Sequence, residues 1–302
     1  MESVHRTVLL NETIDGLALS ANAVVVDATF GGGGHSLEIC KRFPQTKILA
    51  FDQDASVFER VIQKFQGLGC DITFVNANFK DLDAKTSLPK ESVSGIIFDL
   101  GLSSDQLQNS GRGFSFMKDE PLLMTMKENP LPEDITAKEI LNTWAEESLA
   151  DIIYGFGEEK QARPIAKEIV EFRKKQEIKT TFDLVKIIES AIPARFRRGK
   201  IHYATKTFQA IRIAVNNELV VLQEGLGKGF DLLKVGGRMS VITFHSLEDR
   251  IVKKFYKGKE SEGKARLINK KVILASPEEI RDNPRSRSAK LRILEKTTVT
   301  MK

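Results

Sequence analysis

The sequence is poor in the residues that build cross-linked or membrane-spanning proteins. It has only two cysteines, Cys40 and Cys70, too few for a disulfide scaffold or a cysteine-rich zinc module. No stretch approaches the roughly 18 continuous apolar residues of a membrane span, and residues 1–11 lack the apolar segment of a secretory signal peptide. We therefore expect a soluble, cytoplasmic protein of a reducing compartment, with no metal and no membrane partner; a homodimer is left open.

What the chain does have is an ordinary globular composition. It holds 302 residues, of which 41% are hydrophobic and 29% charged. This mixture excludes a disordered chain. The length allows a full core and fits about two domains.

The positive charge is concentrated in two stretches. The net charge is +5; residues 281–302 carry seven basic and two acidic side chains, and residues 190–217 carry six basic and none acidic. Clustered Lys and Arg favour a polyanionic partner, because they neutralise phosphates. A solvated basic face would look the same, and the charge alone does not separate the two interpretations.

Short apolar runs alternate with helical patterns in the first third of the chain. We expect strands at residues 23–27, 47–52, 72–75 and 95–100, with helices between them. Uniformly apolar short strands separated by helices are typical of a parallel sheet with both faces covered. The sequence therefore predicts an α/β fold.

This alternation stops in the middle of the chain. No buried strand is evident from about residue 109 to 202, so we expect a helical insertion and place the boundaries at 1–108, 109–205 and 206–302. We expect one long helix over 208–233 and a loop over 257–285. The helices expected in the insertion are 137–144, 148–154, 163–175 and 182–192, and the strands expected after it are 238–244 and 291–300.

A glycine-rich turn follows the first expected strand. Residues 27–35 read DATFGGGGH, and glycines allow a backbone to approach a ligand closely at the carboxyl ends of parallel strands. The dinucleotide pattern needs a Gly or Ala where this chain has Ser36 or Leu37. The order D-x-x-x-G-x-G, beginning at Asp27, resembles that of class I S-adenosylmethionine methyltransferases. A plain tight turn is the alternative.

Three further residues lie near the expected strand ends. Asp52 follows the loop by about 20 residues and is placed to accept ribose hydroxyls, which NAD and S-adenosylmethionine both offer. Phe79 is placed either against an adenine ring or in the core. Asp99 keeps an acid where many amino-group methyltransferases have D-P-P-Y or N-P-P-Y, but the turn after it is Leu-Gly-Leu-Ser-Ser.

Several longer segments closely resemble one family, the bacterial small-subunit ribosomal RNA (cytosine-N4)-methyltransferases known as RsmH or MraW. The resemblance runs from about residue 5 to 293. The segments that carry it are DATFGGGGH (27–35), DLGLSSDQ (99–106), GRGFSF (111–116), HYATKTFQAIRI (202–213), FHSLEDR (244–250) and NPRSRSAKLR (283–292).

The resemblance implies a Rossmann-like class I methyltransferase sheet with an inserted helical domain for substrate recognition. It implies the cofactor S-adenosyl-L-methionine and, as substrate, the N4 amine of a cytidine in the decoding region of 16S rRNA in the small ribosomal subunit. The family's cofactor contacts fall on Gly33, Gly34, His35, Asp52, Phe79, Asp99 and Gln106.

This chain departs from the family pattern at two places. Leu123 and Thr125 stand where the family usually has an acid and an arginine. If those two residues pair with each other, losing both leaves no charge without a partner. Tyr203 and Lys206 replace a usual Pro and Arg, and lysine lacks the bidentate fork of arginine. If the first pair contacts RNA or shapes the acceptor pocket, activity or substrate choice changes.

Methyl transfer requires the acceptor nitrogen, the methyl carbon and the sulfur to be held in line. We expect Asp99 to accept a hydrogen bond, and then the proton, from the cytosine amine, and His245 to orient the base or take the proton. The alternatives are cofactor binding alone for Asp99 and a local turn contact for His245.

The target base has to leave its stack to reach such a site, and phosphate contacts would hold the strand. Phe114 or Phe116 would be available for stacking, although both are also suited to a core. The residues expected to contact RNA are Arg112, Arg195, Arg197, Arg198, Lys200 and Lys206.

Two other functions remain open at this stage. An RNA-binding or ribosome-assembly factor with weakened catalysis would explain the altered 122–126 segment. A nicotinamide-dependent oxidoreductase would use the same glycine turn, but the missing third glycine argues against it.

Overall fold

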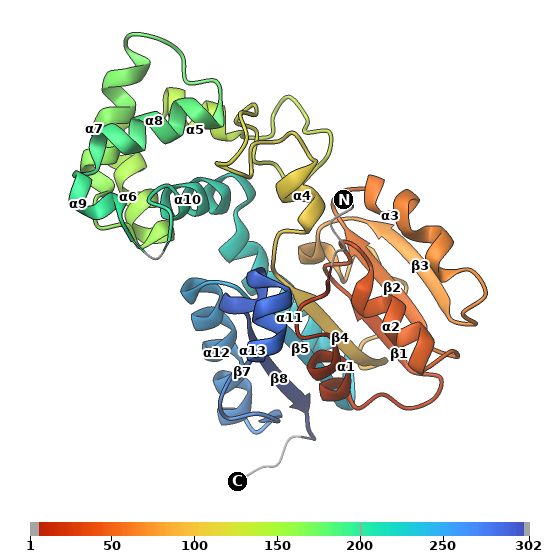
Figure 1. Cartoon of the computed structure of the whole chain (residues 1–302). Helices are drawn as coiled ribbons and strands as arrows, with labels where there is room; N and C mark the ends of the chain where they lie inside the picture. Colours follow the sequence, from red (N-terminus) through yellow and green to blue (C-terminus); the bar gives the residue numbers. More distant parts are fainter. Residues whose placement is uncertain (1–5, 200, 299–302) are drawn as a thin grey trace. The chain divides into compact units, whose positions relative to one another are not determined.

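The computed structural model describes residues 6–199 and 201–298, and the chain divides into two compact units (Figure 1). The sheet unit comprises Met1–Gly101 and Leu219–Lys302, and the helical unit comprises Leu102–Glu218.

The sheet unit is built on an eight-stranded sheet in the order β3-β2-β1-β4-β5-β8-β6, with β7 also paired to β8. Strands β1 to β5 run parallel to one another, and β8 runs antiparallel to β5, β6 and β7. The expected parallel α/β sheet is confirmed. The strands are β1 Val24–Asp27, β2 Lys47–Asp52, β3 Asp71–Asn76, β4 Val93–Asp99, β5 Leu233–Thr243, β6 Ala265–Leu267, β7 Ile273–Leu274 and β8 Lys290–Lys296.

Helices cover both faces of this sheet because neighbouring strand residues point to opposite sides. Val25 packs with α1, α2 and α3, whereas Val26 packs with α11 and α12. Two separate apolar clusters result, which explains the uniformly apolar strands. The helices are α1 Leu10–Leu17, α2 Gly34–Arg42, α3 Ser56–Val61, η1 Ile62–Phe65, η2 Phe79–Asp81, α11 Glu218–Leu232, α12 Ser246–Ser261, α13 Pro277–Asp282 and η3 Pro284–Ser288.

The helical unit has its own apolar core, formed chiefly by α5 to α8 and α10. Thr136 and Thr180 cap α5 and α8 through their side chains, as the sequence signature of helix starts predicts. The four helices expected between residues 137 and 192 are present. The helices of this unit are α4 Ser104–Gln108, α5 Ala137–Thr143, α6 Glu146–Gly157, α7 Ala162–Arg173, α8 Thr181–Ala191, α9 Ala194–Arg197 and α10 Thr205–Asn216.

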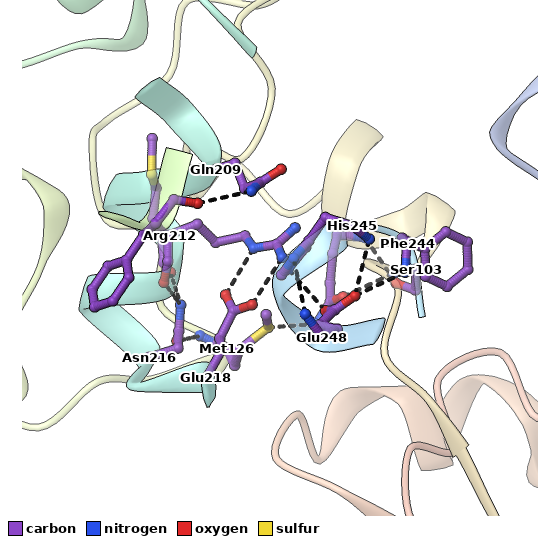
Figure 2. Close-up of polar contacts among 12 residues, drawn as sticks. Ser103, Met126, Gln209, Arg212, Asn216, Glu218, Phe244, His245 and Glu248 are labelled. Carbon is purple, nitrogen blue, oxygen red and sulfur yellow. Dashed lines mark hydrogen bonds and ion pairs between the residues drawn. The ribbon is translucent and has the colours of Figure 1, made fainter. Parts of the chain in front are cut away.

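The long helix expected over 208–233 is instead two helices. Asn217, between α10 and α11, has a left-handed backbone (φ 49°), a conformation that Asn tolerates better than most residues. Arg212 donates two hydrogen bonds of 2.7 and 2.8 Å to the Glu218 carboxylate across this break (Figure 2). The two compact units divide at 101/102 and 218/219. The domain boundaries expected from the sequence, 108/109 and 205/206, stay a prediction.

The loop expected over 257–285 is wrong, because regular structure occupies much of it. Helix α12 extends to Ser261, strands β6 and β7 follow, and α13 begins at Pro277. The sequence at the start of α13 is typical of a helix start, with Ser276 as the N-cap and a proline in the first turn. The Ser276 side chain accepts a hydrogen bond from the Glu279 N–H. In the part of the chain that is described, no helix is long and apolar enough to cross a bilayer.

One disulfide joins Cys40 in α2 to Cys70 before β3, a pairing that the sequence did not predict. Cys40 is fully buried. The bridge fixes α2, which follows the glycine turn, to the edge of the sheet. A single bridge of this kind is still no disulfide scaffold, and a reducing compartment favours the dithiol form.

Reduction of this bridge is expected to lower the free energy of unfolding. The two cysteines are 30 residues apart, and closing a loop of that length removes chain entropy worth roughly 3–4 kcal/mol from the unfolded state. Urea unfolding with and without reductant measures the difference. The double variant C40A/C70A should not respond to reductant; equal midpoints for oxidised and reduced wild type would contradict the pairing.

Candidate active site

Three carboxylates lie at one edge of the sheet because three parallel strands end in aspartate. β1, β2 and β4 end at Asp27, Asp52 and Asp99, and Asp27 is in register with Ala50 and Ile97. The carboxyl ends of parallel strands form the ligand-binding edge of open α/β sheets. The expected strand-end positions of Asp52 and Asp99 are confirmed.

The glycine turn is anchored to Asp52. The Gly31 N–H donates to Oδ2 of Asp52 at 2.8 Å, and the Asp54 N–H donates to Oδ1 at 2.9 Å. Gly33 has φ +70°, and a Cβ there would lie 2.7 Å from the Phe30 ring. Glycine at this position is therefore required by the turn itself. Both Asp52 oxygens thus accept backbone N–H groups of the segments that flank the strand end.

Asp27 is buried behind the turn. The Ser36 hydroxyl donates to Oδ2 at 2.6 Å, and the Thr29 N–H donates to Oδ1 at 3.3 Å. Burial outweighs these two hydrogen bonds and raises the pKa of Asp27 to about 6, and the Asp52 charge adds to the rise. Ser36 occupies the place of the third glycine in the dinucleotide pattern, so a structural role for its hydroxyl explains that departure.

Asp99 is the most perturbed of the three carboxyl groups. Burial, with smaller contributions from the charges of Asp27 and Glu248, raises the pKa of Asp99 to about 7, although the Gly101 N–H donates to its carboxylate. The His35 Nδ1 lies 3.9 Å from Oδ2. Among the described residues, no hydrogen bond reaches Oδ1, which is buried. This oxygen is an acceptor in need of a donor.

His245 caps helix α12, as Figure 2 shows. Its Nδ1 accepts from the Glu248 N–H at 3.4 Å, and Glu248 Oε2 in return accepts from the backbone N–H groups of Phe244 and His245. The Nε2 lies 3.1 Å from Glu248 Oε1, without the alignment of a hydrogen bond. Because the Nδ1 lone pair is occupied, this geometry favours a positioning role over that of a proton acceptor.

The remaining two cofactor candidates have intramolecular contacts of their own. The Phe79 ring packs edge-on against Phe98 at 5.4 Å and lies so close to Gly225 of α11 that a Cβ there would be 2.5 Å from it. Gln106 belongs to the helical unit, where its Oε1 accepts from the Ser103 N–H at 2.9 Å. These contacts hold both side chains in fixed positions.

The expected RNA-contacting residues, all in the helical unit, divide into two groups. Arg112 is 5% exposed and donates to the Met126 carbonyl, Arg197 bonds the Ile192 carbonyl, and Lys206 bonds the Glu158 carbonyl. These three have structural contacts. Arg195 and Arg198 are exposed, and Lys200 lies outside the described residues.

The two departures at 123 and 125 leave no stranded charge. Thr125 is 4% exposed, and its hydroxyl donates to the Lys127 carbonyl at 3.1 Å. The segment is held by Asn216, which accepts from the Met126 N–H and donates to the Met124 carbonyl (Figure 2). If the family's acid and arginine form an ion pair, losing both is tolerated when no buried charge is left without a partner. The neutral, hydrogen-bonded side chain of Thr125 meets this condition.

Sequence reasoning missed Thr29, Ser36 and Glu248. The Thr29 hydroxyl accepts from the Asp99 N–H at 2.6 Å and so links the ends of β1 and β4. Glu248 follows His245 by three residues, the spacing of a capping box, but His is not among the usual N-cap residues. The three-residue spacing therefore indicates a capping box, whereas the histidine at the N-cap does not.

The acidic edge distinguishes between cofactors. A dinucleotide would bring a doubly negative pyrophosphate to the glycine turn, beside three carboxyl groups. S-adenosylmethionine brings a sulfonium and an ammonium, which carboxylates attract. The unpartnered Asp99 oxygen and the Asp52 carboxylate fit this second ligand, which disfavours the oxidoreductase alternative.

A profile of the MraW methylase family matches residues 2–297. The chain belongs to this family. Three curated relatives named ribosomal RNA small subunit methyltransferase H are similar to it. They come from Persephonella marina (45% identity, 96% of this chain and 98% of the relative), Spiroplasma kunkelii (44%, 98% and 99%) and Lactobacillus gasseri (43%, 98% and 100%).

Among solved structures, an rRNA methylase from Streptococcus thermophilus aligns over 98% of this chain and 99% of its own, with 13% identity and a TM-score of 0.46. Membership of the methylase family confirms the resemblance that the motifs indicated and makes this chain a methyltransferase.

Replacing Asp99 with Asn is expected to stabilise the protein at high pH. The folded-state pKa of Asp99, about 7, lies above the ordinary 3.8, so the folded state binds the proton more tightly. Stability is therefore lost as the pH rises from about 4 to about 7. D99N should lose the pH dependence of the free energy of unfolding that Asp99 causes. It should keep the smaller dependence caused by Asp27, whose pKa is about 6. Denaturant unfolding of wild type and D99N at pH 4.5, 6 and 8 measures this dependence. The same pH dependence in both proteins would contradict the raised pKa of Asp99.

Proposed function

We propose that this chain transfers the methyl group of S-adenosyl-L-methionine to the N4 amine of a cytidine in 16S rRNA of the small ribosomal subunit. The observation that carries the proposal is the buried, unpartnered Asp99 oxygen at the end of β4, next to the glycine turn. The names of the relatives give the class of RNA. The cytoplasm, where ribosomes are assembled, is the corresponding compartment.

The cofactor would be held by residues of the strand edge. When bound, S-adenosylmethionine supplies an electrophilic methyl carbon on a sulfonium. Asp52 would accept hydrogen bonds from the ribose, and the turn at Gly33, Gly34 and His35 would lie along the methionine part. Phe79 and Gln106 complete the cofactor residues that the family pattern implies.

Asp99 is proposed to accept the proton that the cytosine amine loses. The cytosine amine is conjugated and weakly nucleophilic, so it needs an acceptor for an N–H as the new N–C bond forms and the S–C bond breaks. A carboxyl whose pKa is raised to about 7 holds the proton more readily than an ordinary aspartate. His245 is proposed to fix the start of α12 through its capping hydrogen bonds, and so to act as a positioning residue, rather than to take the proton.

The alternative of an assembly factor with weakened catalysis has no observation in its favour. The unusual segment around Thr125 is buried and internally satisfied. A homodimer stays a prediction.

Methyl transfer is expected with small subunits that lack the modification. Wild-type protein with labelled S-adenosylmethionine should place the label on a cytidine, identified as N4-methylcytidine by nucleoside mass spectrometry. D99N should lower kcat by about 10²- to 10⁴-fold. For wild type, kcat/KM should rise with pH and level off above about 7, the pKa of Asp99, and D99N should lose this inflection.

D83N is the matched control, since Asp83 is an exposed carboxylate that pairs with Lys228 and is not among the expected site residues. It should retain full activity. Absence of label with the wild-type protein, or a methyl group on any atom other than N4, would refute the proposal.

A further inference from the structure

An exposed aromatic side chain lies in the basic stretch of the helical unit. Phe196, in the short helix α9, is 51% exposed. The guanidinium of Arg195 lies over its ring, 4.9 Å from the centroid. This contact covers one part of the ring and leaves much of it open to solvent, so the ring can accept another planar group.

The charge around this ring is positive and uncompensated. Arg195 and Arg198 are both exposed, and within residues 6–199 and 201–298 neither guanidinium has a hydrogen-bonded or ionic partner. Glu189, an acid at the end of α8, is bound by Arg197 at 3.3 Å. A partner that approaches Phe196 therefore meets two available guanidinium groups, which suits phosphate.

The other aromatic rings of this segment are occupied. His202 stacks on Phe116 with centroids 4.5 Å apart and on Tyr203 at 4.2 Å. Phe114, which the sequence suggested for stacking, is 6% exposed and belongs to the core. In the described part of the unit, the Phe196 ring contacts no other aromatic ring, and two exposed arginines, Arg195 and Arg198, lie beside it in the chain.

We propose that Phe196 is a stacking platform for an unpaired RNA base, with Arg195 and Arg198 binding the adjoining phosphates. An aromatic face stacks any base, whereas bases within a duplex have no free face. The ligand is therefore a single-stranded segment. The inference rests on the proposed function, because that function supplies the RNA; it adds a residue and a strand state that the function does not specify.

The test is the affinity of the full chain for a fluorescein-labelled single-stranded RNA of about 12 nucleotides and for the matching duplex, measured by anisotropy. Phe196→Ala should weaken single-strand binding by roughly 5- to 100-fold, the range for loss of one stacked base, and leave duplex binding unchanged. Phe196→Trp should restore single-strand binding. Circular dichroism and the unfolding midpoint check that each variant is folded.

Phe182 provides the matched control for the ring. It is 40% exposed in the same unit, but its backbone N–H bonds the Asp119 carboxylate and its neighbour is Asp183, so its surroundings are acidic. Phe182→Ala should leave RNA binding unchanged. Equal losses for both alanine variants, or no loss for Phe196→Ala, would overturn the proposal.

Salt dependence separates the ring from the arginines. Arg198→Gln should reduce the slope of log K against log salt by about 0.7, the value for one phosphate contact to a single strand, while Phe196→Ala leaves the slope unchanged. Arg163→Gln, at an exposed arginine of α7, is the control and should change neither affinity nor slope. An Arg198→Gln slope equal to that of wild type would remove the phosphate contact from the proposal.

Two further outcomes identify what has failed. If Phe196→Ala weakens binding to intact small subunits but not to naked RNA, the partner is a ribosomal protein and the proposal is overturned. If wild type binds RNA through Phe196 but transfers no methyl group, the platform stands and the proposed reaction fails.

Discussion

The convergence of three aspartates at one edge of a parallel sheet is the constraint on which the rest of the structure depends. Parallel pairing in register brings the ends of β1, β2 and β4 together, and burial then makes ionisation of Asp27 and Asp99 unfavourable. The carboxyl groups are tolerated because backbone N–H groups and the Ser36 hydroxyl bond them, and because two of them have raised pKa values. The edge is therefore acidic, ordered and ready for a cationic ligand.

The sequence predicted the sheet better than its surroundings. The apolar runs AVVVD and GIIFD identify buried parallel strands, and they end in Asp27 and Asp99. The break at Asn217 was not predictable in the same way, because hydrophobic periodicity continues through it and only the backbone conformation, fixed by Arg212 and Glu218, divides the helix. The disulfide depends on a contact between residues that the sequence separates by 30 positions.

The site residues show the same division between local and long-range information. Motif resemblance identified Asp52 and Asp99, whose strand-end positions follow from local pattern. It could not show that His245 is engaged in a helix cap, or that Arg112 is buried against Met126, because both facts depend on residues distant in sequence or on an unusual cap. The exposure of the Phe196 ring is likewise not predictable from the sequence, because exposure depends on tertiary packing and phenylalanine is more often buried.

The most direct test of this account is the titration of the Asp99 carboxyl group itself. Carbon-13 labelling of aspartate, with D99N to assign the resonance, would follow its ionisation by NMR in the ligand-free protein. The account predicts a midpoint of about 7, caused by burial beside Asp27 and Glu248. A midpoint near the ordinary 3.8 would mean that water reaches the strand edge freely and that Asp99 is an unremarkable surface acid.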